Sequence, residues 1–120
     1  MEYVRTVDFA AFPTGERGQQ LLVGRDYGAQ GCNIRCIQVP LGGGSPAGRH
    51  SHVFEQIYYI ISGIMDLEIA GEQLTAGPGS TVFIPAGVPH RNWNGGTNVV
   101  VHLALMVPEP EPGQPISQPA

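Results

Sequence analysis

The chain has 120 residues, which suffice for one hydrophobic core but not for two. Hydrophobic residues make up 42% of it and charged residues 13%, and a net charge of −4 is spread without acidic or basic runs. This balance argues against a nucleic-acid surface or a polybasic membrane anchor. The 17 glycines and 11 prolines indicate many turns and favour an all-β domain.

Short apolar segments separated by Gly, Pro and Asn clusters are typical of strands and turns. In chain order, the expected strands cover residues 20–23, 33–41, 55–61, 64–70, 73–76, 81–84 and 99–107. The segment 64–70 alternates most clearly between apolar and polar side chains, which predicts one buried and one exposed face. A tight turn at Gly71 and Glu72 should return the chain into the next strand.

We predict a single domain over residues 1–107, followed by a tail over residues 108–120. The tail holds five prolines and two acidic residues, so it should be extended and have no core of its own. Residues 1–12 lack the apolar run of a signal peptide, and no segment is long enough to span a membrane. We therefore expect a cytoplasmic protein in which Cys32 and Cys36 remain free thiols.

The placement of the histidines predicts a metal site. Side chains two residues apart on a strand point to the same face, so the imidazoles of His50 and His52 should point the same way. Gln56 has the same parity, and His90 follows a strand and a proline turn that can return it on an adjacent strand. Three ring nitrogens and one amide oxygen can then converge on one divalent transition metal.

Two gapped motifs around these residues resemble those of the cupin superfamily. The first runs from Gly44 through His50, His52 and Gln56 to Gly63, and the second from Gly79 through Pro85, Gly87 and His90 to Asn94. The second motif matches at every fixed position. The resemblance implies a double-stranded β-helix, or jelly-roll barrel, with a mononuclear metal held by His50, His52, Gln56 and His90. A metal-free cupin with ordinary barrel-lining histidines is the alternative.

Position 56 departs from the motif, because a Gln stands where the family usually has a Glu. The neighbouring Glu55 is one residue too close to His52, and its parity sends it to the opposite face, so we favour Gln56 as the ligand. With a neutral ligand set, a divalent ion keeps its full +2 charge. Such a site should bind metal less tightly but favour anionic ligands. The ligand types suit Fe, Mn, Ni or Zn without selecting among them.

Other polar residues have two interpretations each. If Gln56 points inward, Tyr58 and Ile60 do so too, and the phenol then acts as a general acid or simply fills the barrel. His102, in an apolar strand, is a packed core or rim group or a catalytic residue. Arg35 can face the barrel or solvent, whereas Arg49 and Arg91 should face solvent or a neighbouring subunit.

Three functions are consistent with the sequence. The segment around the first motif is similar to small cupins related to the pectin-degradation protein that linearises unsaturated uronates, a family that also uses two His, a Gln and a His. This resemblance implies a metal-dependent isomerase or tautomerase acting on a small, anionic, sugar-acid-like substrate. The alternatives are an Fe(II)-dependent dioxygenase and a non-catalytic sensor or carbohydrate-binding module. Cupins of this size usually form homodimers, which would cover an exposed sheet edge.

Overall fold

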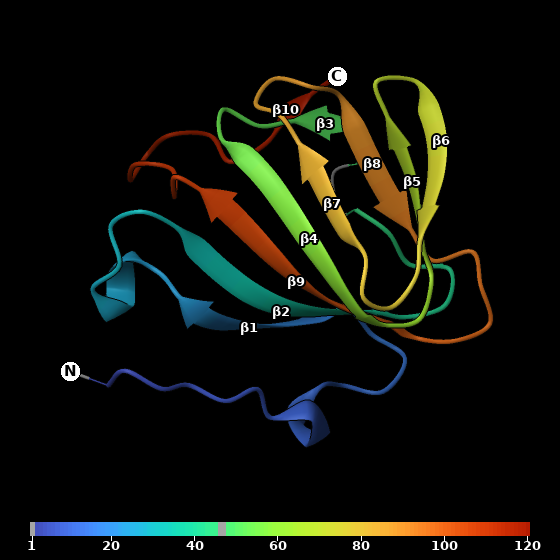
Figure 1. Cartoon of the computed structure of the whole chain (residues 1–120), viewed down its shortest axis with the longest axis horizontal. Coiled ribbons are helices and arrows are strands. Elements are labelled where there is room, and N and C mark those ends of the chain that lie inside the picture. The colour runs from blue at the N-terminus through green and yellow to red at the C-terminus, as the bar shows by residue number, and fades with distance from the viewer. Residues whose placement is uncertain (1, 46–47) are drawn as a thin grey trace.

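Two five-stranded antiparallel sheets face each other in the computed structural model, which describes residues 2–45 and 48–120 (Figure 1). The first sheet has the strand order β1-β2-β9-β4-β7 and the second has the order β10-β3-β8-β5-β6. The strands are β1 (Gly18–Val23), β2 (Asn33–Val39), β3 (His50–Ser51), β4 (Glu55–Ser62), β5 (Met65–Ile69), β6 (Glu72–Ala76), β7 (Thr81–Ile84), β8 (His90–Trp93), β9 (Val100–Val107) and β10 (Gln118–Pro119). Two 3₁₀ turns, η1 (Phe9–Ala11) and η2 (Arg25–Tyr27), flank β1. The predicted all-β jelly-roll architecture is confirmed.

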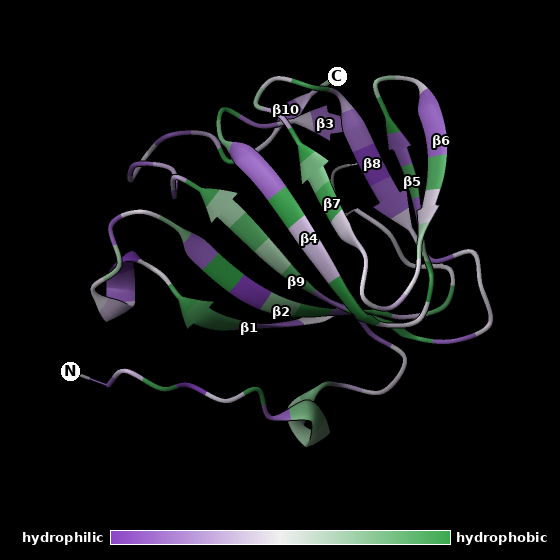
Figure 2. Cartoon of the chain, viewed as in Figure 1, coloured by the Kyte–Doolittle hydropathy of each residue, from purple (hydrophilic) through white to green (hydrophobic). Residues whose placement is uncertain are grey.

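Alternating side chains build the core between the sheets. Along β4, Gln56, Tyr58 and Ile60 are buried, whereas Glu55 and Tyr59 are exposed. Figure 2 shows this alternation as bands of hydrophilic and hydrophobic residues along β2 and β4. The core contains the side chains of Ile37, Val39, Tyr58, Ile60, Met65, Leu67, Ala76, Val82, Ile84, Val100 and Ala104. Burial of these apolar groups is the main source of stability for such a domain.

The predicted strands agree with the structure, with small shifts at their ends. The segment 81–84 has the predicted bounds, and the first strand begins two residues earlier than expected. The turn between β5 and β6 lies at Ala70 and Gly71 rather than at Gly71 and Glu72, because these two residues adopt positive φ angles of 51° and 83°. His50 and His90 lie on adjacent strands, β3 and β8, as expected, although His52 falls just after the end of β3. Strand β10 had not been predicted.

Gly63 has a structural role that its motif position suggested. It adopts a φ of 78°, and a Cβ atom there would collide with the backbone of Val99 and Val100. A side chain at this position would therefore push β9 away from the turn that follows β4. Asn94, the last residue of the second motif, also has a structural role. Its buried side chain donates to the carbonyls of Val39, at 3.2 Å, and Asn98, at 2.8 Å.

The segment from residue 108 to 120 contacts the barrel at several points. Strand β10 pairs with β3, so that Gln118 lies opposite Ser51 and Pro119 opposite His50. Earlier in the segment, Glu109 accepts hydrogen bonds from the backbone of Arg25, at 2.7 Å, and from Asn33 Nδ2, at 2.8 Å. The C-terminal residues therefore lie beside the strand that carries His50.

Cys32 and Cys36 are both free, as predicted. Across the described ranges 2–45 and 48–120, the structure has no helix with the length and hydrophobicity needed to cross a membrane.

Candidate metal centre

Three histidines meet at the interior face of the second sheet. His50 on β3 lies directly opposite His90 on β8, and His52 follows β3. One ring nitrogen from each lies within 4.8 Å of the others, and all three residues are buried. The ring centroids are separated by 4.4 Å for His50 and His90, 4.6 Å for His50 and His52, and 4.9 Å for His52 and His90. The convergence expected from the sequence is present.

A backbone carbonyl fixes the tautomer of each histidine. Nδ1 lies 2.6 Å from the Gly48 oxygen in His50, 2.7 Å from the Ile116 oxygen in His52 and 2.9 Å from the Val88 oxygen in His90. A carbonyl oxygen can only accept a hydrogen bond, so each Nδ1 carries the proton. Each Nε2 therefore presents a lone pair, which is the form of histidine that binds metals.

The environment favours the neutral form of His52 and His90. The pKa of His90 is lowered to about 4, mainly by burial, with the Val88 carbonyl opposing the shift and the neighbouring His50 and His52 adding to it. Burial also lowers the pKa of His52. In addition, Nε2 of His90 is buried and has no hydrogen-bond partner among the described residues. A buried acceptor without a partner is costly, and a bound cation would satisfy it. The donor set thus fits a divalent metal.

Gln56 reaches the same region from the other sheet. Its Nε2 donates to the carbonyl oxygen of Leu105 at 2.7 Å, which leaves Oε1 as the atom available to a cation. The chain passes from β3 in one sheet to β4 in the other between His52 and Glu55, so strand parity does not connect Gln56 with the histidines. Alternation within β4 itself buries Gln56 and exposes Glu55. The inward orientation was predicted correctly, and ligation by Gln56 stays a prediction.

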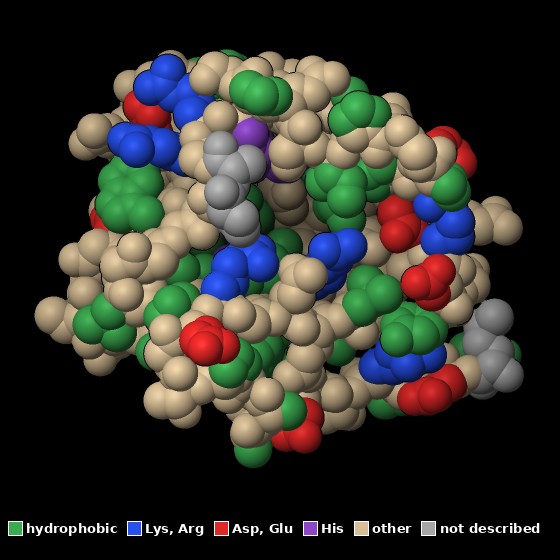
Figure 3. All heavy atoms as spheres, turned by 180° about the vertical axis from the view of Figure 1, so that it is seen from behind, with side chains coloured by type: hydrophobic (Ala, Val, Ile, Leu, Met, Phe, Trp, Pro, Cys, Tyr) green, Lys and Arg blue, Asp and Glu red, His purple; other side chains and the backbone are tan. Residues whose placement is uncertain are grey.

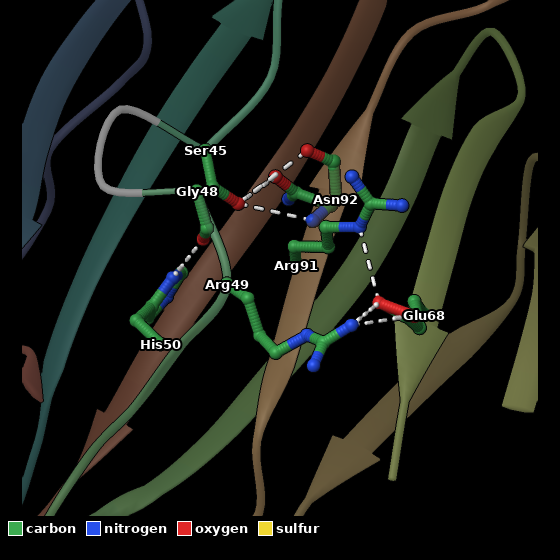
Figure 4. A network of polar contacts seen from close by, with 7 residues as sticks. All are labelled: Ser45, Gly48, Arg49, His50, Glu68, Arg91 and Asn92. Atoms are coloured by element: carbon green, nitrogen blue, oxygen red, sulfur yellow. Dashed lines mark hydrogen bonds and ion pairs between the residues drawn. The ribbon is translucent and has the colours of Figure 1, made fainter. Parts of the chain in front are cut away.

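A polar network supports the loop that precedes β3 (Figure 4). Ser45 Oγ donates to Asn92 Oδ1 at 2.6 Å and accepts from the backbone N–H of Asn92 at 3.0 Å. This links β8 to the segment whose Gly48 carbonyl orients His50. Residues 46 and 47, which belong to the variable part of the first motif, lie outside the described residues.

Arg49 and Arg91 flank the histidines in sequence but make ion pairs away from them. Both guanidinium groups contact Glu68 Oε1 at 3.1 Å, and the Arg91 guanidinium also lies 4.8 Å from the centre of the Trp93 ring. Figure 4 shows Arg49 directed toward Glu68 while His50 points to Gly48. Both arginines are more than two-fifths exposed, in agreement with the predicted outward orientation.

Comparison with known proteins identifies the family. A family model described as a cupin domain matches residues 37–107, which is more than half of the chain. The chain belongs to the cupin family. Among curated proteins, none shows significant sequence similarity to it.

Solved structures of cupins and related proteins share this fold. An RmlC-like cupin from Methanocaldococcus jannaschii with a double-stranded β-helix fold has a TM-score of 0.74 at 20% identity, covering 90% of this chain and 92% of that one. The polyketide cyclase RemF from Streptomyces resistomycificus has a TM-score of 0.73 at 24% identity, with 88% and 80% covered. A putative sugar phosphate isomerase from Acidithiobacillus ferrooxidans has a TM-score of 0.66 at 28% identity, with 85% and 65% covered.

The barrel of this cupin contains a cavity of about 270 Å³ beside the histidines. The cavity adjoins the hydrophobic core. Four residues line the cavity and also belong to the core: Ile37, Val39, Tyr58 and Ala104. The lining is formed by Arg17, Gln19, Asn33, Arg35, Ile37, Val39, Ser45, His50, His52, Phe54, Gln56, Tyr58, Asn92, His102, Ala104, Met106, Ile116 and Ser117. No acidic side chain occurs among these described residues. A cavity of this size suits a small molecule.

Tyr58 and His102 contact each other in the wall of the cavity. Their ring centroids are 5.0 Å apart in an edge-to-face arrangement. Burial lowers the pKa of His102 to about 4, with a smaller contribution from the positive charge of Arg17. Burial raises the pKa of the Tyr58 phenol, although Arg17 opposes this shift. At neutral pH, His102 is therefore an uncharged imidazole and Tyr58 an uncharged phenol.

Sequence reasoning missed Arg17, and it left the orientation of Arg35 open. Both line the cavity. Residues 33, 35, 37 and 39 share the inner face of β2, and residues 17 and 19 lie on the matching face beside β1. The alternation of an Arg and a Gln at positions 17 and 19 ahead of an apolar strand was the available signal. It was hidden because both residues are polar and lie outside the strand expected over residues 20–23.

Proposed function

We propose that this cupin is an enzyme that holds one divalent transition metal, Fe, Mn, Ni or Zn, through His50, His52, His90 and Gln56. Its substrate is a small, anionic, sugar-acid-like molecule, and the reaction is an isomerisation or tautomerisation. The observation that carries the proposal is the convergence of three buried histidines whose Nδ1 atoms all donate to backbone carbonyls. This arrangement directs three lone pairs toward one point. Metal binding explains it more simply than a purely structural role of the three histidines does.

The charge of the site favours an anionic substrate. All four proposed ligands are neutral, so the ion would keep a charge of +2. No acidic side chain among the described residues lines the cavity to offset it. Electrostatic attraction inside a partly buried pocket is stronger than in water, so a carboxylate-bearing molecule gains more there than a neutral one.

The residues beside the metal centre can move a proton. A bound divalent ion supplies Lewis acidity, which polarises a carbonyl or hydroxyl oxygen of the substrate. Neutral His102 can accept a proton from an adjacent carbon or hydroxyl, and no hydrogen-bond partner among the described residues occupies its Nδ1. The Tyr58 phenol, held protonated by its burial, can donate one. Such a pair meets the needs of a tautomerisation, in which one proton is removed and another returned.

Two similarities support this choice of chemistry. The first motif, with Gln56 in place of Glu, resembles small cupins that act on unsaturated uronates. The putative sugar phosphate isomerase from Acidithiobacillus ferrooxidans shares the fold at 28% identity.

Turnover of an unsaturated uronate by the purified protein tests the proposal. The protein is loaded separately with Fe(II), Mn(II), Ni(II) or Zn(II), and loss of the substrate double-bond absorbance is followed. We expect turnover with at least one metal and none after chelation or in His90→Ala. Uptake of oxygen that occurs only with iron would identify a dioxygenase instead, and binding without turnover would identify a sensor.

We further propose a cytoplasmic homodimer that forms along the first sheet. Strand β1 is the outermost strand of that sheet, and the segment before it exposes Tyr3, Val4 and Phe9. Exposed edges and apolar side chains of this kind favour association with a second copy. Analytical ultracentrifugation should give twice the mass of one chain, and deletion of residues 2–9 should give the monomer mass.

A further inference from the structure

Among the described residues, two arginines stand out because they have no acidic partner. The sequence contains six arginines and no lysine. Four of them form ion pairs with glutamates: Arg5, Arg25, Arg49 and Arg91. Within the described ranges, Arg17 and Arg35 form no such pair, and these are the two arginines that line the cavity. In a chain with a net charge of −4, the placement of these two arginines without ion pairs at one cavity requires an explanation.

Neutral groups hold Arg35 in place. Its Nε donates to Asn33 Oδ1 at 3.0 Å, and its Nη1 contacts Gln19 Oε1 at 3.5 Å. Glu109 and Glu111 line a second, smaller cavity together with Arg35. The carboxylate of Glu109 accepts from Asn33 Nδ2 and the backbone of Arg25, and Glu111 pairs with the Arg25 guanidinium at 3.9 Å. The Arg35 guanidinium is thus oriented by amides while its charge is left without compensation.

The guanidinium groups of Arg17 and Arg35 line the same cavity. Arg35 lies opposite Leu21 in the β1–β2 pair, and Arg17 precedes β1 on the matching face. Burial lowers the pKa of Arg17, Tyr58 raises it, and the charge of Arg35 lowers it again. Two like charges near each other in a partly buried site repel, and an anion placed between them would relieve the repulsion. In Figure 3, arginine side chains lie beside a hollow in which histidine is visible.

We propose that Arg17 and Arg35 form an anion subsite that binds the carboxylate of a sugar-acid substrate, while the oxygens of the same molecule face His50 and His52 in the same cavity. This inference rests on the proposed function in placing the substrate in that cavity. Guanidinium groups bind carboxylates through paired, charge-assisted hydrogen bonds, which fix orientation as well as adding affinity. Arg17 and Arg35 thereby determine specificity, because a neutral sugar of the same size lacks the group that they bind.

Calorimetric titration of the full-length, zinc-loaded protein tests the subsite. The two probes are D-galacturonate and its uncharged methyl ester, which differ only at the carboxyl group. We expect galacturonate to bind more tightly by about tenfold or more. Arg17→Gln and Arg35→Gln should each reduce this preference, and the double variant should abolish it. Arg49→Gln, which makes the same charge change outside the cavity, should leave it intact.

Structural damage is separated from loss of the subsite by two further measurements. Zinc content should be unchanged in all variants, and Arg35→Lys should restore part of the preference because it keeps the charge. The inference is wrong if the wild type binds neither probe or binds both equally, or if the double variant keeps the preference.

The outcomes also distinguish this inference from the proposed function. Arginine-dependent binding of galacturonate without turnover of an unsaturated uronate would remove the enzyme proposal and keep the subsite. Turnover with an unchanged KM in the double variant would keep the enzyme and remove the subsite.

Discussion

His50 and His90 occupy directly opposite positions on strands β3 and β8, and they are the one residue pair that joins these strands in register. Strand β3 has two residues, so backbone pairing contributes little to holding it in place. A metal bound by both side chains would cross-link the strands. Metal binding at these histidines would therefore be coupled to the stability of this end of the barrel.

Metal binding should raise the melting temperature of the wild-type protein. At a metal concentration one hundred times the dissociation constant, stabilisation is about 2.7 kcal/mol, which corresponds to a shift on the order of 10 °C for a domain of this size. His90→Ala should lose most of the shift. Differential scanning calorimetry with and without the metal gives both values. An equal shift in the variant would show that the metal binds elsewhere.

Loss of the Ile116 carbonyl should weaken metal binding. This oxygen accepts from Nδ1 of His52 at 2.7 Å and so holds the ring with Nε2 available. Removal of residues 116–120 leaves the ring without that partner, and outer partners of this type are worth about 10- to 100-fold in metal affinity. Removal of residues 118–120 alone deletes β10 but keeps the carbonyl, and it is the matched control. Competition titration with a chromophoric chelator measures both affinities, and equal losses in the two truncations would contradict this role.

The amide of Gln56 has a structural role in addition to its proposed role as a ligand. Its Nε2 donates to the Leu105 carbonyl, so Gln56→Glu would place an ionised oxygen against another oxygen. We expect the metal-free variant to lose about 1–3 kcal/mol of unfolding free energy at pH 7 and to regain part of it at acidic pH, where the carboxyl is protonated. Urea denaturation at both pH values measures this.

Glu55 provides the control for that experiment. It is the neighbouring residue on β4 and is exposed, so Glu55→Gln makes the reverse change on the outer face. Its effect should stay within about 0.5 kcal/mol. A comparable loss in both variants would mean that the contact with Leu105 is unimportant.

His102 should make stability fall as the pH is lowered. Burial brings its pKa in the folded protein to about 4, below the ordinary value of 6.5. Between these values the unfolded chain binds more protons, so the contribution of neutral His102 is fully present above pH 6.5 and is lost as the pH falls toward 4. The full difference is about 3 kcal/mol.

Substitution of His102 separates its effect on the pH dependence of stability from that of His90, whose pKa is also lowered in the metal-free protein. His102→Gln does not titrate in this window. Its unfolding free energy should therefore change less between pH 7 and pH 4.5 than that of the wild type. The same pH dependence in both proteins would rule out His102 as a source.

Strand alternation and motif spacing allowed most of the barrel to be predicted. The inward direction of Gln56, Tyr58 and Ile60 followed from the period of β4, and the histidines followed from two motifs whose glycines fix the turns. These features are local, so the sequence carries them directly.

The remaining features depend on contacts between distant segments. Strand β8 is polar except for Trp93, and it is held by register with β3 and β5 rather than by its own propensity. The carbonyl of Ile116 reaches His52 across 64 positions, a contact that the composition of residues 108–120 does not predict. Arg17 has no apolar neighbour pattern to mark it as inward-facing. Tertiary structure, and not local pattern, places all three.

Elemental analysis of the protein from unsupplemented culture tests the metal centre most directly, with His50→Ala purified in parallel. We predict close to one transition metal ion per wild-type chain and a strong reduction in the variant, with both proteins folded by circular dichroism. Wild-type protein that carries no transition metal and takes none up on titration would contradict the assignment.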